Sequence, residues 1–228
     1  MSDQTNNDVY LEWLESAEES IKKGDYETAA NHLRRVAHYF MLQKDTAKFK
    51  EFTRKTGDYY YHAAEKLRGS DQHLKTVLLY IKAAQCYKEN GDHASAVGCD
   101  LAIRAFYASS FKSDPISLQG STDILKRLGD YFIEEKEFEK ARECYETAAR
   151  KAVEEGKPML AAGFYSDAGD CSRLLMDVPR AADEYASAAD NYFKAEKYLE
   201  ASWLYNLSGF LLISLKRFGE ARFLARKA

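Results

Sequence analysis

The chain has 228 residues, of which 46% are hydrophobic and 30% are charged, and its net charge is −3. This apolar content is typical of a folded protein rather than a disordered one. The small negative charge gives no general attraction to nucleic acid, and the three prolines leave long stretches that favour helix.

Five helices are predicted in the first half from the spacing of apolar residues and the short breaks between them. Gly24 suits the end of the first helix because it adopts a left-handed conformation without strain. Asp25 suits the start of the next because its side chain can cap the backbone. The break at residues 89–93 repeats this arrangement. The predicted helices span residues 8–23, 25–42, 45–67, 71–89 and 94–111.

The clearest break in the chain is Ser113-Asp114-Pro115, because Asp before Pro favours a turn and a helix start. We therefore predict one array over residues 1–228 with a sub-boundary near 112–116. No stretch has the alternation and flanking turns of a strand, so about eleven helices are expected. The later helices span residues 116–135, 138–155, 158–175, 178–195, 198–215 and 218 to the end.

A helical phrase recurs about every 40 residues in the second half. Each copy begins with a glycine where two helices should touch, continues into a helix opened by an aromatic or apolar residue, and has an alanine three residues later. The copies are Gly129–Ala148, Gly169–Ala188 and Gly209–Lys227, with helix openers Phe138, Val178 and Phe218 and alanines Ala141, Ala181 and Ala221.

This spacing resembles the tetratricopeptide pattern. Small residues let antiparallel helices approach closely, and large aromatic residues fill the gaps between neighbouring pairs. Each pair exposes an apolar edge that only the next pair can cover. The predicted fold is therefore all-α: a right-handed superhelical array of antiparallel helix hairpins, a tetratricopeptide-like α-solenoid.

The segment from Leu160 to Lys194 and the segment from Ala195 to Leu212 resemble the soluble NSF attachment protein (SNAP) family. They share an AA-x-x-Y/F-x-x-AG unit, a short polar break and a helix of the form A-A-x-x-Y-x-x-A-A-x-x-Y. The resemblance implies an adaptor of vesicle trafficking that lies along a four-helix SNARE bundle and couples it to a AAA ATPase.

Two segments depart from that family. SNAP proteins have an apolar loop near the N-terminus that touches membrane, whereas Lys22–Tyr26 here is short and charged. SNAP proteins end in an acidic tail, whereas this sequence ends in basic residues within a predicted helix. We expect either further residues after Ala228 or another subunit to cover that helix.

Residues suited to catalysis are scarce. No two histidines are spaced to share a metal on one helix, and no glycine-rich phosphate loop occurs. Four Gly-Asp pairs, beginning at Gly57, Gly91, Gly129 and Gly169, are interpreted as helix contacts or caps. We expect no enzyme activity, no cofactor and no metal site.

A run of basic residues suggests a contact surface for an acidic partner helix: Arg34, Arg35, Lys44, Lys48, Lys50, Arg54 and Lys55. The alternative is a solvated outer face, partly neutralised by Asp45 and Glu51. Tyr59 and Tyr60 are added to the candidate protein-binding residues. Together with Tyr61 they are consecutive on a helix, so at least one should be exposed, unless all three pack between helices.

Three hypotheses about function follow. The first is a non-catalytic SNAP-like adaptor for SNARE-like coiled coils and a AAA ATPase. The second is a general tetratricopeptide scaffold for a peptide or an unrelated folded partner. The third is an enzyme or sensor, which requires a deep polar pocket. No nucleic-acid partner is expected. The first residues are polar, unlike a signal peptide, and the longest apolar run, Phe210–Leu215, is too short to span a membrane. We therefore expect a cytoplasmic protein with at most peripheral membrane association. The four cysteines have no CxxC spacing, so we expect free, buried thiols.

Overall fold

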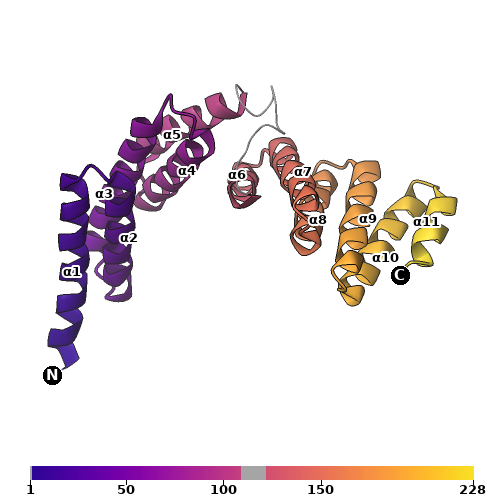
Figure 1. The fold of residues 1–228 in the computed structure, drawn as a ribbon, viewed down its shortest axis with the longest axis horizontal. Coiled ribbons are helices and arrows are strands. Elements are labelled where there is room, and N and C mark those ends of the chain that lie inside the picture. Colours follow the sequence, from indigo (N-terminus) through magenta and orange to yellow (C-terminus); the bar gives the residue numbers. More distant parts are fainter. Residues whose placement is uncertain (1, 109–121) are drawn as a thin grey trace. The chain divides into compact units, whose positions relative to one another are not determined.

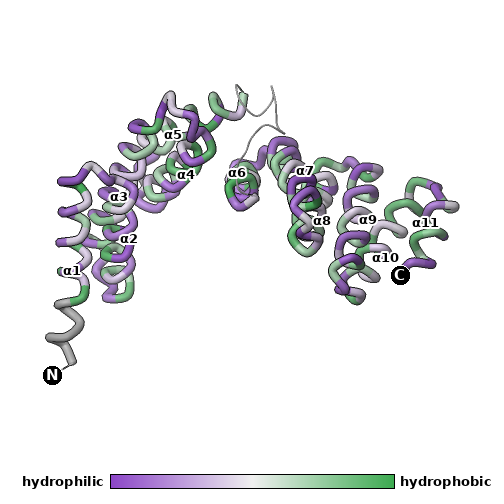
Figure 2. Tube along the Cα trace, viewed as in Figure 1, coloured by the Kyte–Doolittle hydropathy of each residue, from purple (hydrophilic) through white to green (hydrophobic). Residues whose placement is uncertain are grey.

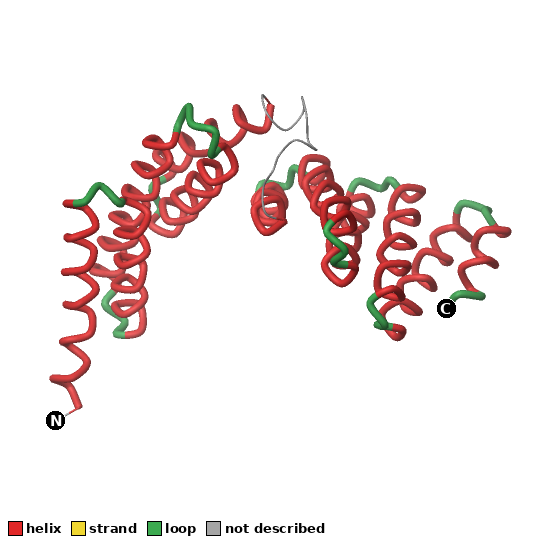
Figure 3. Tube along the Cα trace, in the orientation of Figure 1, coloured by secondary structure: helices red, strands yellow, loops and turns green. Residues whose placement is uncertain are grey.

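The structure, a computed structural model, describes residues 2–108 and 122–228, with side chains described from residue 9 onward in the first helix. These residues form eleven helices and contain no strand, and within each of the two described ranges the helices are joined by short turns (Figures 1 and 3). The helices are α1 Ser2–Lys22, α2 Tyr26–Leu42, α3 Thr46–Leu67, α4 His73–Asn90, α5 His93–Phe106, α6 Thr122–Glu134, α7 Phe138–Glu154, α8 Pro158–Leu174, α9 Val178–Lys194, α10 Tyr198–Ser214 and α11 Phe218–Ala225.

These bounds agree closely with the helices predicted from the sequence. Helix α1 begins earlier than predicted. The first residues of the helix predicted at 116–135 lie outside the described part of the chain. The predicted break at Ser113-Asp114-Pro115 also lies there.

The chain divides into two compact units, Met1–Asp114 and Pro115–Ala228. The first contains α1 to α5 and the second contains α6 to α11. Within each unit, every helix packs mainly against the helix before it and the helix after it, running antiparallel to both (Figure 1). The predicted all-α array of antiparallel hairpins is therefore confirmed. Within the described ranges, no helix is long and apolar enough to span a membrane.

Both units are held together by small residues and tyrosines from the predicted repeat. In the second unit the core includes five alanines of α9 and α10 that are at most 1% exposed, with Tyr185 and Tyr205 between them. The hydroxyl of Ser208 lies in the same core and donates to the carbonyl oxygen of Ala182 at 2.7 Å. Hydrophobic and hydrophilic segments alternate along the helices of both units (Figure 2), as expected where each helix buries one stripe. All four cysteines are free and buried.

The Gly-Asp pairs have two structural roles. Gly91 ends α4 with a φ of 77°, a conformation that favours glycine, and the following Asp92 caps α5. Gly57, Gly129 and Gly169 are instead places where a tyrosine ring of the next helix rests on the backbone. The prediction of helix contacts and caps is thus confirmed at all four positions.

Candidate protein-binding surfaces

The structure does not gather the predicted basic residues into one strip. Arg34 of α2 faces α4, where its guanidinium donates two hydrogen bonds to the carboxylate of Glu89, at 2.6 and 2.7 Å. Arg54 of α3 lies 3.5 Å from the carboxylate of Asp92, the capping residue of α5. These two arginines are therefore already paired, each with a different neighbouring helix.

A second group lies along α3 beside two stacked aromatic rings. The ammonium of Lys48 is 4.8 Å from the centre of the Phe40 ring, and that of Lys55 is 5.1 Å from the centre of the Phe52 ring. The two rings stack with their centres 5.5 Å apart. Lys55 also binds the Glu51 carboxylate at 2.6 Å. Lys48 and Lys55 thus share one side of α3, as their spacing predicts.

Four of the predicted cations have no ion-pair partner among the described residues, and all four are exposed. Asp45, which the sequence suggested as a neutralising residue, accepts a hydrogen bond from the backbone N–H of Lys48 as the cap of α3. Positive charge therefore remains available on this pair of helices. We call these residues the α2–α3 cations: Arg35, Lys44, Lys48 and Lys50.

The three consecutive tyrosines of α3 are less accessible than the sequence suggested. Tyr60 is only 6% exposed, its hydroxyl donates to the side chain of Asn31 at 2.7 Å, and burial raises its pKa to about 12. Tyr59 and Tyr61 are half-buried, and the ring of Tyr59 stacks on that of Tyr26. None of the three is fully exposed, because α2 and α4 cover α3 from both sides. Of the two alternatives, packing between helices describes Tyr60, while Tyr59 and Tyr61 remain partly accessible.

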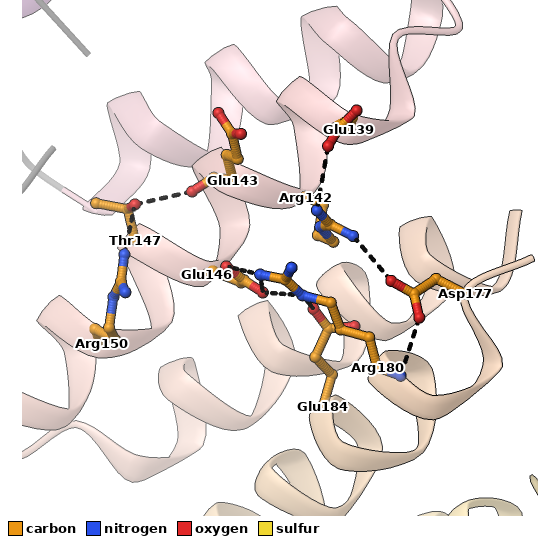
Figure 4. A network of polar contacts seen from close by, with 9 residues as sticks. All are labelled: Glu139, Arg142, Glu143, Glu146, Thr147, Arg150, Asp177, Arg180 and Glu184. Carbon is orange, nitrogen blue, oxygen red and sulfur yellow. Dashed lines mark hydrogen bonds and ion pairs between the residues drawn. The ribbon is translucent and has the colours of Figure 1, made fainter. Parts of the chain in front are cut away.

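A network of charged side chains joins α7 to α9 (Figure 4). Arg180 of α9 donates hydrogen bonds to both carboxylate oxygens of Glu146 on α7, at 2.8 and 3.1 Å. Arg142 of α7, whose side chain is 7% exposed, lies 3.6 Å from the carboxylates of Glu139 and Asp177. Two arginines from alternate helices are therefore directed toward one group of carboxylates.

Glu184 is the buried member of this network. Its side chain is 7% exposed and lies 3.7 Å from Arg180, and neither of its oxygens has a hydrogen-bond partner in the described part of the chain. Burial, together with the neighbouring Glu146, raises the pKa of Glu184 to about 8. The carboxyl is thus mostly neutral at pH 7, which reduces the cost of enclosing it.

The network has the properties of a structural connection rather than a reaction centre. Its members bind one another across α7 and α9, and its most perturbed carboxyl is enclosed by helices. Among residues 2–108 and 122–228, no group of three or more histidine, cysteine, aspartate or glutamate side chains is placed to hold a metal ion.

A stripe of exposed apolar residues runs along the outer side of α10. The exposed fractions are 82% for Leu199, 64% for Trp203, 69% for Phe210 and 49% for Ile213. Together with Asn206, these residues are spaced alternately by four and three positions, which places them on one face of a helix. We call these five residues the α10 stripe.

A groove of about 450 Å³ lies beside the α10 stripe within the second unit. Most of its lining is apolar, and it contains one carboxyl group, that of Glu200. Its walls come from three helices: Ser166 of α8, Tyr192 of α9, and Leu199, Glu200, Trp203 and Leu204 of α10.

Sequence reasoning missed this surface. The spacing of the α10 stripe was visible, but α10 is apolar on its opposite face as well, where Ala201, Tyr205 and Leu212 are buried. A helix that is apolar all round gives no signal about which face its neighbours cover.

A sequence model of the family described as "Soluble NSF attachment protein, SNAP" matches residues 11–198, which is most of the chain. None of the curated proteins compared with the chain matches it.

Among solved structures, the crystal structure of BtubC (BKLC) from P. vanneervenii has 16% sequence identity, a TM-score of 0.56, and coverage of 97% of this chain and 89% of that one. This similarity shows a shared fold. A tetratricopeptide repeat protein from Parabacteroides merdae ATCC 43184 has 16% identity, a TM-score of 0.27, and coverage of 96% of this chain and 91% of that one. The TPR2AB domain of yeast Sti1, in complex with pHSP90, has 12% identity, a TM-score of 0.27 and 97% coverage of both chains. Scores of 0.27 are too low to compare whole architectures.

Proposed function

The chain belongs to the soluble NSF attachment protein family, and from this membership we propose that it is a non-catalytic adaptor. It binds a bundle of helices of the SNARE type and couples that bundle to a AAA ATPase. The observation that supports the binding surface is the set of α2–α3 cations, which are exposed and have no ion-pair partner among the described residues.

The α2–α3 cations are suited to an acidic helical surface. Lysine and arginine side chains that have no ion pair within the chain can bind partner carboxylates without first breaking an internal ion pair. Because these side chains are exposed, we expect them to increase the association rate and to make binding sensitive to salt. The adaptor acts in the cytoplasm, with at most a peripheral contact to membrane and without nucleic acid.

The test is a pull-down of an assembled SNARE four-helix bundle with the full chain at low salt. We expect binding that weakens as salt rises, and a further loss of at least about tenfold in affinity for Lys48→Glu combined with Lys50→Glu. Lys197→Glu combined with Lys216→Glu, an equal double charge reversal at exposed positions of the second unit, is the control and should bind normally. If the bundle is not retained, or if both charge reversals weaken binding equally, the proposed bundle-binding surface is wrong.

Coupling to the ATPase needs a separate measurement. We expect the chain and the bundle together, but neither alone, to increase ATP hydrolysis by an NSF-type AAA ATPase. If the bundle binds and the rate does not change, the chain is a helix-binding scaffold and the coupling role is excluded. If acidic peptides bind the α2–α3 cations and bundles do not, the general scaffold of the second hypothesis replaces the proposal.

A further inference from the structure

We propose that the α10 stripe and its groove bind a basic amphipathic helix of another protein. This surface belongs to the second unit and the α2–α3 cations belong to the first, so the proposal extends the proposed function and can be tested independently of it. The proposal rests on three observations: the geometry of the stripe, the groove beside it, and the unpaired carboxylates on the helices that form the groove.

The geometry of the stripe fits a helix as its occupant. At 100° per residue, the members of the α10 stripe lie on the side of α10 opposite the buried residues Ala201, Ser208 and Leu212. Three of its four apolar members are more than 60% exposed, although each is a large side chain. Apolar residues alternating by three and four positions form the seam along which two helices pack.

The groove provides a place for side chains of that helix. The rings of Trp203 and Tyr192 and the side chain of Leu199 line a space of about 450 Å³ that opens directly beside the stripe. An apolar side chain placed there would lose its contact with water, and so would the exposed Trp203. Large aromatic residues in partly formed pockets are the usual anchors of protein interfaces.

The charge at this surface indicates a basic partner. Neither Glu200 nor Asp167 has a hydrogen bond or an ion pair to another described residue. Both act on the hydroxyl of Tyr192 in the groove, where burial and then these two carboxylates raise the tyrosine pKa. Glu200 lines the groove, and Asp167 directly follows Ser166, another lining residue, so both unpaired carboxylates belong to helices that form the groove.

Asp167 has a further feature that favours a cationic partner. It is half-buried, and this burial raises its pKa to about 6. Lys126, the cation whose charge acts on Asp167, is itself hydrogen-bonded to Asp130 at 2.8 and 3.0 Å. The other charged groups that act on Asp167 are the carboxylates of Asp130 and Asp170. A lysine or arginine from a partner helix would provide the ion pair that this carboxyl lacks.

The same charges argue against two other occupants. A second copy of the chain would bring one acidic edge against another, which is unfavourable. A bilayer with anionic lipids would repel Glu200 and Asp167, although exposed Trp and Phe side chains are otherwise suited to a membrane surface. Both remain as distinguishable outcomes of the experiment.

The experiment uses the full chain with Trp13→Phe, which leaves Trp203 as the only tryptophan. The probe is a synthetic helical peptide with leucine along one face and lysine elsewhere. We expect saturable binding, a blue shift of Trp203 fluorescence as the ring leaves water, and affinity that falls as salt rises. A peptide of the same composition in scrambled order should bind at least about tenfold more weakly, because it has no apolar face.

Matched variants locate the site, with labelled peptide and fluorescence anisotropy as the readout. Leu199→Ala and Glu200→Lys should each weaken binding at least about tenfold. Phe218→Ala, an exposed aromatic outside the groove, and Glu196→Lys, an exposed carboxylate outside it, should leave binding unchanged. Because all four side chains are exposed, we expect circular dichroism to show that every variant is folded at the temperature of the binding measurement.

Several results would overturn the proposal. These are no saturable binding of the peptide, equal binding of the scrambled peptide, and equal loss with the control variants. Trp203-dependent binding to phosphatidylserine vesicles in place of the peptide would assign the surface to membrane. Trp203-dependent self-association without peptide binding, measured by light scattering, would assign it to a second copy of the chain.

Discussion

At the scale of single residues, the helices are held in register by tyrosine rings placed on glycine. The ring of Tyr185 rests on Gly169, and its hydroxyl donates to Asp170, the next residue, at 2.7 Å. Tyr145 contacts Gly129 and Asp130 in the same way. In these two pairs the glycine makes room for the ring and the aspartate accepts its hydroxyl, so three residue types explain a phrase that recurs in the sequence.

Helix α8 contains two glycines with opposite expected responses to alanine. At Gly169 an added Cβ would lie 2.7 Å from the Tyr185 ring. Gly169→Ala should therefore lower the unfolding free energy by about 2 kcal/mol, because the steric clash outweighs the gain of about 1 kcal/mol in helix propensity. At Gly163 nothing lies within 4 Å of the added Cβ, so Gly163→Ala should add about 0.5–1 kcal/mol. Urea unfolding of both variants measures this, and equal effects would contradict the proposed contact.

The buried Glu184 makes a pH-dependent contribution to stability. Its pKa is about 8 in the folded state against an ordinary value of 4.5, so the folded state holds a proton that the unfolded state has released. This contribution is complete below pH 4.5 and is lost as pH rises through 8. Glu184 and then Arg180 lower the pKa of Glu146, so Glu146 titrates below its ordinary value of 4.5, outside this range.

The measurement is unfolding free energy between pH 5 and pH 9 for the natural chain and for Glu184→Gln, which keeps the shape without the charge. We expect the natural chain to lose stability relative to the variant as pH rises. Glu196→Gln, at an exposed position, should follow the natural chain. Parallel curves for all three proteins would show that Glu184 is ionised at neutral pH.

At the scale of elements, eight of the turns between helices share one conformation. In each, a residue with φ between 59° and 77° directly precedes the N-cap residue of the next helix. Glycine occupies this position before Asp25, Asp92 and Lys157, and a non-glycine residue occupies it in the other five turns. The caps differ more: Asp25, Asp45, Asp92 and Asp177 bond the backbone with their side chains, while Lys157, Lys197 and Arg217 make no such bond.

This difference predicts opposite effects at two caps. Asp45→Ala removes the hydrogen bond to the N–H of Lys48 and should cost about 1 kcal/mol of unfolding free energy. Lys197→Asp should add about 1 kcal/mol, because it supplies a cap that α10 lacks and places a negative charge at a helix N-terminus. Thermal melts and urea midpoints are sufficient to measure both. An unchanged Asp45→Ala protein would contradict the role of this cap.

At the scale of the whole molecule, the chain divides into two compact units. In an array of this kind, each helix depends on the helices directly before and after it. Stability is then expected to be local to each unit rather than distributed over 228 residues. The sequence suggested one array with a sub-boundary near 112–116, and whether the array behaves as one folding unit is a matter for experiment.

We expect fragments 1–114 and 115–228, expressed separately, to be helical and to unfold cooperatively in urea, because each contains its own buried core. Circular dichroism at increasing urea measures this. A fragment without a cooperative transition would show that the two units depend on each other. An equimolar mixture of the fragments is the control, since recovery of lost structure on mixing would show the same dependence.

The sequence by itself determined the helices, their turns and the way successive hairpins pack. The apolar spacing, the capping aspartates and the glycines act over a few residues, so these features are local and can be seen without coordinates. The family resemblance follows from the same repeated residues. The Gly-Asp pairs could also be interpreted correctly, because only a close contact or a turn needs glycine there.

Only the tertiary structure decided which side chains are exposed. Arg34 and Arg54 looked equivalent in sequence but bind carboxylates of different helices, and Tyr60 is covered while Trp203 is not. Exposure depends on which neighbouring helix lies over a residue, and that neighbour is distant in sequence. For α10, apolar on every side, the pattern could not show which face the rest of the unit covers, so the α10 stripe emerged only when the helices were placed in three dimensions.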